Sequence, residues 1–332
     1  MNSGFLSFKE QSAHYFNRPH AANLTEPLSV AAAWRGQDLR RQSDWVETLS
    51  PSEIDEIKAA MAAVKLVGKE RRSLLAEDFP LPQLSHKMAN WRSELGRGRG
   101  FQVIRGIPVA EWSKSEAELF FWCFGLHMGR PGGQNPAGDL LGHVTDTGAA
   151  TSDKMSRLYK TSSNIEYHCD GADVVGLLCL KAAKSGGQSR IVSSVSVFNE
   201  LVKTRPDLAA RLFDPVRLDI RNEGSRSGTQ YINVIPSRYA DGVLRTFYHA
   251  DYFRSVTRHD DVGPFSKDEQ AFFDSYEAIA ADPDLYLDME LQPGDIQLLS
   301  NHTNLHARTD YEDYDDPAEK RHLLRLWISL TD

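Results

Sequence analysis

The sequence predicts a mainly β protein with flanking helices, in which a double-stranded β-helix (jelly roll) core is covered by an N-terminal helical segment. Two observations predict this fold class. Beyond residue 140 the chain contains many short runs rich in apolar and β-branched residues, separated by turn signals, a pattern typical of a double-sheet barrel or jelly roll. Up to about residue 95 the apolar residues instead recur mostly at helical spacing, with polar loops between them.

The N-terminal part contains two well-marked helices. In 54–66 the apolar residues recur at helical spacing behind a Pro-Ser-Glu start signal. A second helix is expected over 82–95, with its proline tolerated in the first turn. The pattern then changes, because 101–108 alternates apolar and polar residues and stops at Gly and Pro, as a strand entering a turn does. Residues 112–125 return to helical spacing.

Strands dominate beyond residue 140, with interrupting helices expected over 194–204 and 267–281. No Pro/Gly/Ser-rich linker, low-complexity tract or obvious internal repeat divides the chain. We therefore expect one domain over 1–332, with a jelly-roll core over 96–332 that carries insertions. The expected strands are 141–144, 167–170, 174–180, 189–193, 216–222, 231–235, 244–248, 296–300 and 323–330.

Composition limits the classes of partner. The net charge is −8 and no segment concentrates Lys and Arg strongly, so we do not expect nucleic acid, whose binding depends on phosphate neutralisation. A small molecule is the expected substrate. Three cysteines are too few and too irregular for a disulfide framework, and no apolar stretch of membrane-spanning length or N-terminal leader is evident. These features predict a cytoplasmic protein, and the helical N-terminal segment offers a surface for homo-oligomer formation.

His168 and Asp170 form the first candidate metal-binding pair. They are two residues apart, so on a β-strand both side chains point to the same face. His306, from a distant strand, would complete two imidazoles and one carboxylate, the facial triad of non-haem Fe(II) oxygenases. For the pair alone the alternative is a hydrogen-bonded core histidine and a turn aspartate before Gly171.

Arg321 and Arg325 form a second candidate group. Four residues apart at the last expected strand, they share a face of that strand among apolar neighbours. Two like charges on an inward face need an anion or carboxylate partner, and guanidinium groups suit a dicarboxylate. Surface arginines are the alternative for one of them.

In these features the chain resembles the taurine dioxygenase-like Fe(II)- and 2-oxoglutarate-dependent oxygenases, which are related to clavaminate synthase. The resemblance covers about residues 95–330 and implies a jelly-roll fold. It rests on His168-Cys169-Asp170, Gly186-Gly187-Gln188-Ser189, Pro293-Gly294-Asp295, Asn301 to His306, and the two terminal arginines.

The resemblance implies His168, Asp170 and His306 as Fe(II) ligands, with 2-oxoglutarate as co-substrate and O₂ as oxidant. It also implies that Arg321 takes the distal (C5) carboxylate of 2-oxoglutarate with help from the Ser189 hydroxyl. Arg325 would bind an anionic substrate or support Arg321. The longer acidic stretch between His306 and Arg321 leaves the choice of main anchor between the two arginines open.

The implied reaction is oxidation of an unactivated C–H bond by hydroxylation, desaturation or cyclisation, with succinate and CO₂ released. The expected substrate is a small polar metabolite, such as an amino acid or another small acid or amine. Halogenating relatives need a small residue in place of the carboxylate, so Asp170 argues against halogenation. Two alternatives remain: a cupin-type metal enzyme that does not use 2-oxoglutarate, and a non-catalytic jelly-roll protein that binds a small ligand.

Candidate substrate contacts lie before the metal-binding pair and in one later segment. Gln134 and Asn135, in a Gly-rich run, and Asn164 offer polar groups, although ordinary loop capping explains such residues equally well. Arg325 is also a substrate candidate through the resemblance. The aromatic segment 247–254 is either packing with a structural ion pair or a wall facing the substrate.

Overall fold

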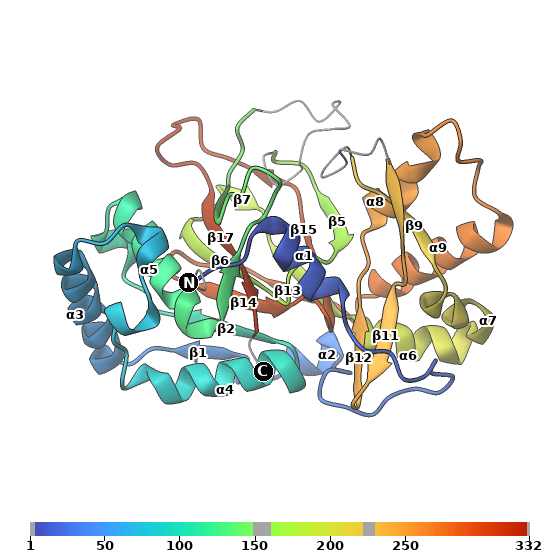
Figure 1. Cartoon of the computed structure of the whole chain (residues 1–332), viewed down its shortest axis with the longest axis horizontal. Helices are drawn as coiled ribbons and strands as arrows, with labels where there is room; N and C mark the ends of the chain where they lie inside the picture. Colours follow the sequence, from blue (N-terminus) through green and yellow to red (C-terminus); the bar gives the residue numbers. More distant parts are fainter. Residues whose placement is uncertain (1–3, 149–160, 222–229, 331–332) are drawn as a thin grey trace.

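A computed structural model of the chain describes residues 4–148, 161–221 and 230–330. Two β-sheets form the centre of the molecule (Figure 1). The larger sheet has the order β1-β2-β14-β6-β17-β3, with β4 also paired to β17. Its strands are β1 (Val46–Thr48), β2 (Phe101–Arg105), β3 (Arg130–Gly132), β4 (Leu141–Val144), β6 (Val174–Lys181), β14 (Ile296–Ser300) and β17 (His322–Ser329).

The smaller sheet has the order β13-β8-β15-β5. Its strands are β5 (Ile165–His168), β8 (Ser189–Ser193), β13 (Leu287–Met289) and β15 (Asn304–Arg308). Side chains from the two sheets pack together between them, among them Val103, Val175 and Leu299 from the larger sheet and Ile191 and Met289 from the smaller. The predicted jelly-roll core, two sheets packed face to face, is thus confirmed.

Helices cover the outer face of the larger sheet, as the sequence predicts (Figure 1). They are α3 (Pro51–Val67), α4 (Leu84–Arg97) and α5 (Lys114–Met128). Trp91, Phe120 and Trp122 from these helices are buried in one apolar cluster with residues of β2, β6, β14 and β17. Capping boxes define the starts of α3 and α5, and Gly68, at φ 67°, ends α3 in the left-handed conformation that glycine tolerates.

A second group of elements covers the other end of the core (Figure 1). Its helices are α6 (Ser194–Thr204), α7 (Pro206–Ala209), α8 (Ala250–Arg254) and α9 (Lys267–Ala280). The other strands of the described residues form three two-stranded sheets: β9 (Val216–Asp219) with β10 (Tyr231–Val234), β11 (Ser237–Ala240) with β12 (Val243–Thr246), and β7 (Ser185–Gly186) with β16 (Tyr311–Glu312).

The N-terminal chain adds α1 (Phe8–Phe16) and α2 (Gly36–Leu39). Short 3₁₀ turns connect other elements: η1 (Arg71–Ser73), η2 (Ala76–Asp78), η3 (Val109–Glu111), η5 (Ala210–Phe213) and η6 (Ser255–Arg258). Within residues 4–148, 161–221 and 230–330, no helix combines the length and apolarity needed to cross a bilayer.

The sequence prediction was wrong in several boundaries. The strand expected over 167–170 is β5, which ends at His168, because the Cys169 N–H donates to the Tyr248 carbonyl and the chain leaves the sheet. The strand expected over 216–222 ends at Asp219, because Arg221 adopts a positive φ. The sequence did not indicate α1, β3, β11, β13 or β15, which are short or lack a clear apolar period.

Candidate metal and co-substrate site

His168, Asp170 and His306 lie close together at the edge of the smaller sheet, where β5 ends. His306 lies in β15 directly opposite His168 at the end of β5, and Asp170 follows two residues later in the connecting loop. One ligand atom from each residue lies within 4.8 Å of those of the other two, and all three residues are half-buried. Two imidazoles and one carboxylate at this spacing fit a divalent metal with open coordination positions.

Neighbouring groups orient these three side chains. The Nδ1 atom of His168 is 2.8 Å from the Glu166 carbonyl oxygen; since a carbonyl only accepts, Nδ1 carries the proton and Nε2 presents its lone pair to the site. The Trp327 Nε1–H donates to Asp170 Oδ2 at 3.0 Å. The backbone N–H of Asp170 donates to Asn301 Oδ1 at 3.0 Å, which fixes the loop after β5.

The charges favour the protonation states that a metal requires. Burial alone would raise the pKa of Asp170, but Arg325 and the two imidazoles hold that pKa at about 2. Burial, with the neighbouring His168, lowers the pKa of His306 to about 3. At neutral pH the site therefore offers a carboxylate and neutral imidazole, and metal binding displaces no proton from either.

A second part of the site extends from the triad into the space between the sheets. Arg321, Leu323 and Arg325 occupy alternate positions, and all three line the same cavity as the metal-binding residues. Arg321 lies one residue before β17, not within it. Ser189 lines this cavity from β8, and its hydroxyl donates to Gln297 Oε1 at 3.0 Å.

Arg308 and Arg321 stand on either side of Tyr311. Their guanidinium carbons are 4.8 and 5.2 Å from the Tyr311 ring centroid. Arg308 donates to the Thr161 carbonyl at 2.7 Å and to the Ser163 carbonyl. The Nη1 atoms of both arginines and Nε of Arg308 are buried without a hydrogen-bond partner in the described chain. Burial lowers the pKa of Arg308 to about 10. Buried, unsatisfied guanidinium groups of this kind require an anionic ligand.

Arg325 instead lies beside Asp170, one of the three candidate metal ligands. Its Nη1 lies 3.7 Å from Asp170 Oδ1, and its Nε donates to Gln134 Oε1 at 2.8 Å. Its guanidinium carbon is 5.4 Å from the Trp327 ring centroid. The two arginines that the sequence paired therefore have different surroundings, although they share one face.

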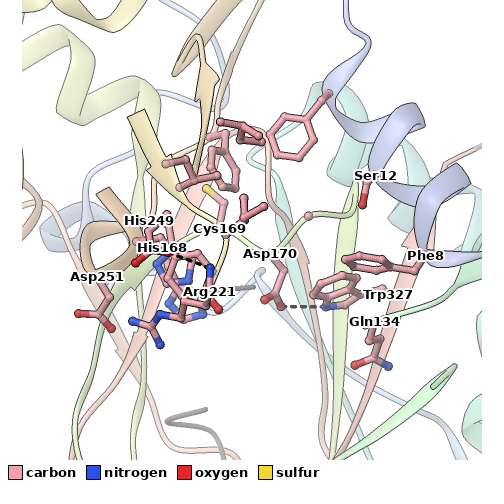
Figure 2. Close-up of a pocket in the computed structure, with 18 of the residues that line it drawn as sticks. Phe8, Ser12, Gln134, His168, Cys169, Asp170, Arg221, His249, Asp251 and Trp327 are labelled. Carbon is pink, nitrogen blue, oxygen red and sulfur yellow. Dashed lines mark hydrogen bonds between the residues drawn. The ribbon is translucent and has the colours of Figure 1, made fainter. Parts of the chain in front are cut away.

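A larger cavity, of about 330 Å³, opens on the outer side of His168 and Asp170. Figure 2 shows Arg221, His249 and Asp251 on one side of it and Phe8, Gln134 and Trp327 on the other, with Asp170 between. Its volume and its mixture of apolar wall with a few polar groups suit a small organic ligand. Further lining residues are mainly apolar, among them Phe16, Ile165, Leu218, Ile220, Ile232 and Phe247.

The expected substrate residues are only partly brought together. Gln134 lines the larger cavity, but its amide donates to the Leu140 and Arg325 carbonyls. Asn135 closes a turn by donating to Asp139, outside both cavities. Asn164 is exposed and donates to Glu166.

The segment 247–254 is divided between the wall of the larger cavity and a structural ion pair. Phe247, Asp251 and Tyr252 line the larger cavity. Arg254 instead forms ion pairs with Asp274 and Glu277 on α9.

Some site residues were missed by the sequence analysis. Arg308 lies two residues after His306, so the alternation that linked the other two arginines would have placed it on the same face. Trp327 stands two residues after Arg325 and follows the same rule. Phe8, Phe16 and Arg221 carried no comparable signal, because they come from elements that the sequence did not indicate as part of the site.

A jelly roll that places two imidazoles, one carboxylate and buried arginines around one cavity defines the class of Fe(II)- and 2-oxoglutarate-dependent oxygenases. Residues 63–327 match the family described as "Taurine catabolism dioxygenase TauD, TfdA family". The chain therefore belongs to this dioxygenase family, and the expected use of Fe(II), 2-oxoglutarate and O₂ is confirmed.

Individual proteins show the same likeness along most of the chain. FR-33289 synthase from Streptomyces rubellomurinus is 29% identical over 311 residues, covering 92% of this chain and 91% of that protein. The taurine hydroxylase-like protein SAT17 from Stachybotrys chartarum is 28% identical over 326 residues, covering 93% and 82%. The solved asparagine oxygenase in complex with Fe(II), 3-hydroxyasparagine and succinate superposes with a TM-score of 0.67 at 15% identity, covering 86% of this chain and 93% of that one.

Proposed function

We propose that His168, Asp170 and His306 hold Fe(II), and that Arg321 with Ser189 binds the distal carboxylate of 2-oxoglutarate. The observation that carries this assignment is the pair of buried guanidinium groups, Arg308 and Arg321, with unsatisfied N–H groups in the cavity that begins at the triad. We assign Arg308 a supporting contact to the same carboxylate.

Each residue has a definite task in this arrangement. With Fe(II) and 2-oxoglutarate bound, O₂ would be the oxidant: 2-oxoglutarate would be oxidised to succinate and CO₂, and the substrate C–H bond would be oxidised by the same O₂ molecule. Arg321 and Arg308 orient the co-substrate by charge and hydrogen bonding in a site from which water is excluded. Arg325 balances the charge of Asp170 and donates to Gln134, so it positions the metal-binding carboxylate rather than the co-substrate.

The substrate is proposed to be a small polar metabolite, such as an amino acid or another small acid or amine, held in the larger cavity beside His168 and Asp170. The solved relative acts on asparagine, as its bound 3-hydroxyasparagine indicates. We further propose that the enzyme is cytoplasmic. Whether the oxidised product is hydroxylated, desaturated or cyclised depends on the substrate.

Anaerobic titration with Fe(II) and then 2-oxoglutarate tests the assignment, because chelation of the co-substrate to iron gives a weak visible charge-transfer band. The band should form in the wild type and be absent in His306→Ala. Arg321→Gln should weaken 2-oxoglutarate binding by about tenfold or more, through loss of a charged hydrogen bond, while iron still binds. Arg238→Gln, on β11 and outside both cavities, is the matched control.

Two results would contradict the proposal in different ways. Iron binding without the band would exclude the 2-oxoglutarate role and favour another cupin-type metal enzyme. Absence of iron binding would mean that the three ligands do not form a metal site.

A further inference from the structure

We propose that Arg221 is the substrate-binding arginine of the larger cavity, and that it selects a substrate with an anionic group on an apolar body. This inference rests on the proposed function, since it concerns the substrate of the same site.

The backbone of Arg221 is held in a conformation that arginine rarely adopts. Its φ is 45°, in the left-handed region. Asp219 imposes this conformation by accepting the Arg221 backbone N–H at 2.8 Å. The Asp219 carboxylate is fully buried, accepts the Ser255 hydroxyl at 2.9 Å and forms an ion pair with Arg258 at 2.6 Å. A strained residue that a buried network holds in place beside a cavity is typical of a functional position.

The guanidinium group of Arg221 lies inside the cavity and is available for a ligand. Its carbon is 4.3 Å from the Tyr252 ring centroid, a stacking contact that uses the face of the guanidinium group rather than its N–H edge. Among the described residues no carboxylate forms an ion pair with it, and Asp251, which also lines the cavity, does not approach within ion-pair distance. Arg325, a substrate candidate from the sequence, also lines the larger cavity, but its guanidinium group already faces Asp170 and Gln134.

Apolar side chains cover much of the remaining wall. On α1, Phe8, Ser12 and Phe16 recur every four residues and all line the cavity. The helix is fixed from behind, where the Tyr15 hydroxyl donates to the Asn301 carbonyl at 2.9 Å. Phe247 packs edge-on against Phe16, with ring centroids 5.0 Å apart, and Ile220 adds apolar wall next to Arg221 in the chain. A ligand that fills this space therefore presents an anion at Arg221 and apolar surface towards α1.

Asp251 provides the alternative reading of the same cavity. If the ligand were a cation or depended on an ammonium group, Asp251 would bind it and Arg221 would serve only to balance that carboxylate. The two alternatives predict opposite effects of replacing Asp251 with a neutral residue. An anionic ligand would bind as tightly or more tightly, because a repulsive charge is removed, whereas a cationic ligand would lose an attractive charge and bind more weakly.

The test uses phenylphosphonate as an anionic probe with an apolar ring, and benzylamine as its cationic counterpart. Each is titrated by calorimetry into the anaerobic full-length enzyme saturated with Fe(II) and 2-oxoglutarate, so that the co-substrate arginines are already occupied. We expect phenylphosphonate to bind more tightly than benzylamine. Arg221→Gln should weaken phenylphosphonate by about tenfold or more, Arg221→Lys should retain part of the affinity, and Arg238→Gln should have no effect.

Two further variants separate binding from a structural role. Arg221→Gly should lose phenylphosphonate affinity while its melting temperature stays equal to the wild type or rises, since glycine tolerates the positive φ. Asp251→Asn should bind phenylphosphonate equally or more tightly. Unchanged phenylphosphonate affinity in Arg221→Gln, no phenylphosphonate binding by the wild type, or tighter benzylamine binding that Asp251→Asn removes would each overturn the inference.

Failure of the proposed function gives a different result. If the proposed function is wrong, the charge-transfer band does not form. Phenylphosphonate is then titrated into the metal-free protein, in which Arg221 and Tyr252 are still present. Loss of phenylphosphonate binding in Arg221→Gln but not in Arg321→Gln would support the anion site even then.

Discussion

A hydrogen bond connects the last strand of the larger sheet to the carboxylate of Asp170, a proposed metal ligand. Trp327 donates to Asp170 Oδ2 and is itself buried. Groups that orient metal ligands in this way typically change metal affinity by 10- to 100-fold when removed. We therefore expect Trp327→Phe, which keeps the ring bulk but removes the donor, to lower Fe(II) affinity by about tenfold, measured by anaerobic iron titration.

Trp45→Phe is the matched control, because the Trp45 Nε1–H donates to the Leu39 and Gln42 carbonyls away from the site. Equal iron affinity in both variants would mean that the Trp327 contact does not orient Asp170.

At the scale of single residues, the sequence predicted which residues belong to the candidate site better than it predicted their neighbours in space. Residue type and spacing led to the three ligands and the Arg321–Arg325 pair, because alternation along a strand is a local rule. The different partners of these arginines could not be predicted, since Arg325 meets Asp170 and Gln134 only through long-range packing. The same rule places Arg308 on the face of His306, but only the fold brings Thr161 and Tyr311 beside it.

Among the elements, α1 depends on a close approach to β3. A Cβ atom added at Gly133 would lie 2.7 Å from the Phe8 backbone nitrogen, and backbone cannot move aside as a flexible side chain does. Gly133→Ala should therefore displace α1 and cost roughly 1–3 kcal/mol, the usual penalty for overpacking. Hydrogen exchange should show reduced protection in 8–16 while the sheets stay protected.

Gly96→Ala provides the comparison for this change, because nothing lies within 4 Å of the added Cβ. Gly96 is inside α4, so alanine should be neutral or stabilising by up to about 1 kcal/mol. A Gly133→Ala protein with unchanged exchange in α1 would contradict the packing argument.

A buried carboxylate, Asp173, holds α1 from its other end. His14 and His302 each approach it at 2.8 Å, and Arg18 forms a further ion pair. Burial alone would raise the pKa of Asp173, but hydrogen bonds from the two histidines and the charge of Arg18 hold that pKa well below its usual value. Because folding lowers this pKa, the stabilisation by Asp173 is fully present above the unfolded value of about 3.9, declines as pH falls below it, and is lost only as pH falls through the much lower folded value.

Asp173→Asn should therefore lower the free energy of unfolding by about 3 kcal/mol at pH 7, since it leaves Arg18 and the two histidines without their buried carboxylate partner. Urea unfolding of both proteins at several pH values measures the difference, which should shrink as pH falls below about 4. A difference that is the same at pH 7 and about pH 2.5 would show that the charge of Asp173 does not stabilise the fold.

The elements that the sequence analysis missed share a physical cause. Strand β15 is five residues long and contains His306 and Arg308, so its inward face is polar and shows no apolar alternation. It forms because it is paired on both sides, with β8 and β5. The long helices α3, α5 and α9 were predictable because their capping residues and apolar spacing are local.

At the scale of the whole molecule, the proposed metal and co-substrate site takes its residues from both sheets. His306 and Ser189 lie on the smaller sheet, whereas Arg325 is on β17 of the larger sheet and Arg321 directly precedes it. A co-substrate that joins the metal to Arg321 therefore ties the two sheets together. Ligands that bind only the folded state add about 2.7 kcal/mol of stability at a concentration 100 times their Kd.

We therefore expect anaerobic Fe(II) with 2-oxoglutarate to raise the melting temperature by about 5 °C, more than the sum of the two added singly. The increase exceeds the sum because 2-oxoglutarate needs both the metal and Arg321 for full affinity, so each ligand strengthens the other. In Arg321→Gln the increment from Fe(II) should remain and the increment from 2-oxoglutarate should largely vanish. A full increment from 2-oxoglutarate without metal would instead place its binding site away from the triad, and the two sheets would then not be coupled through it.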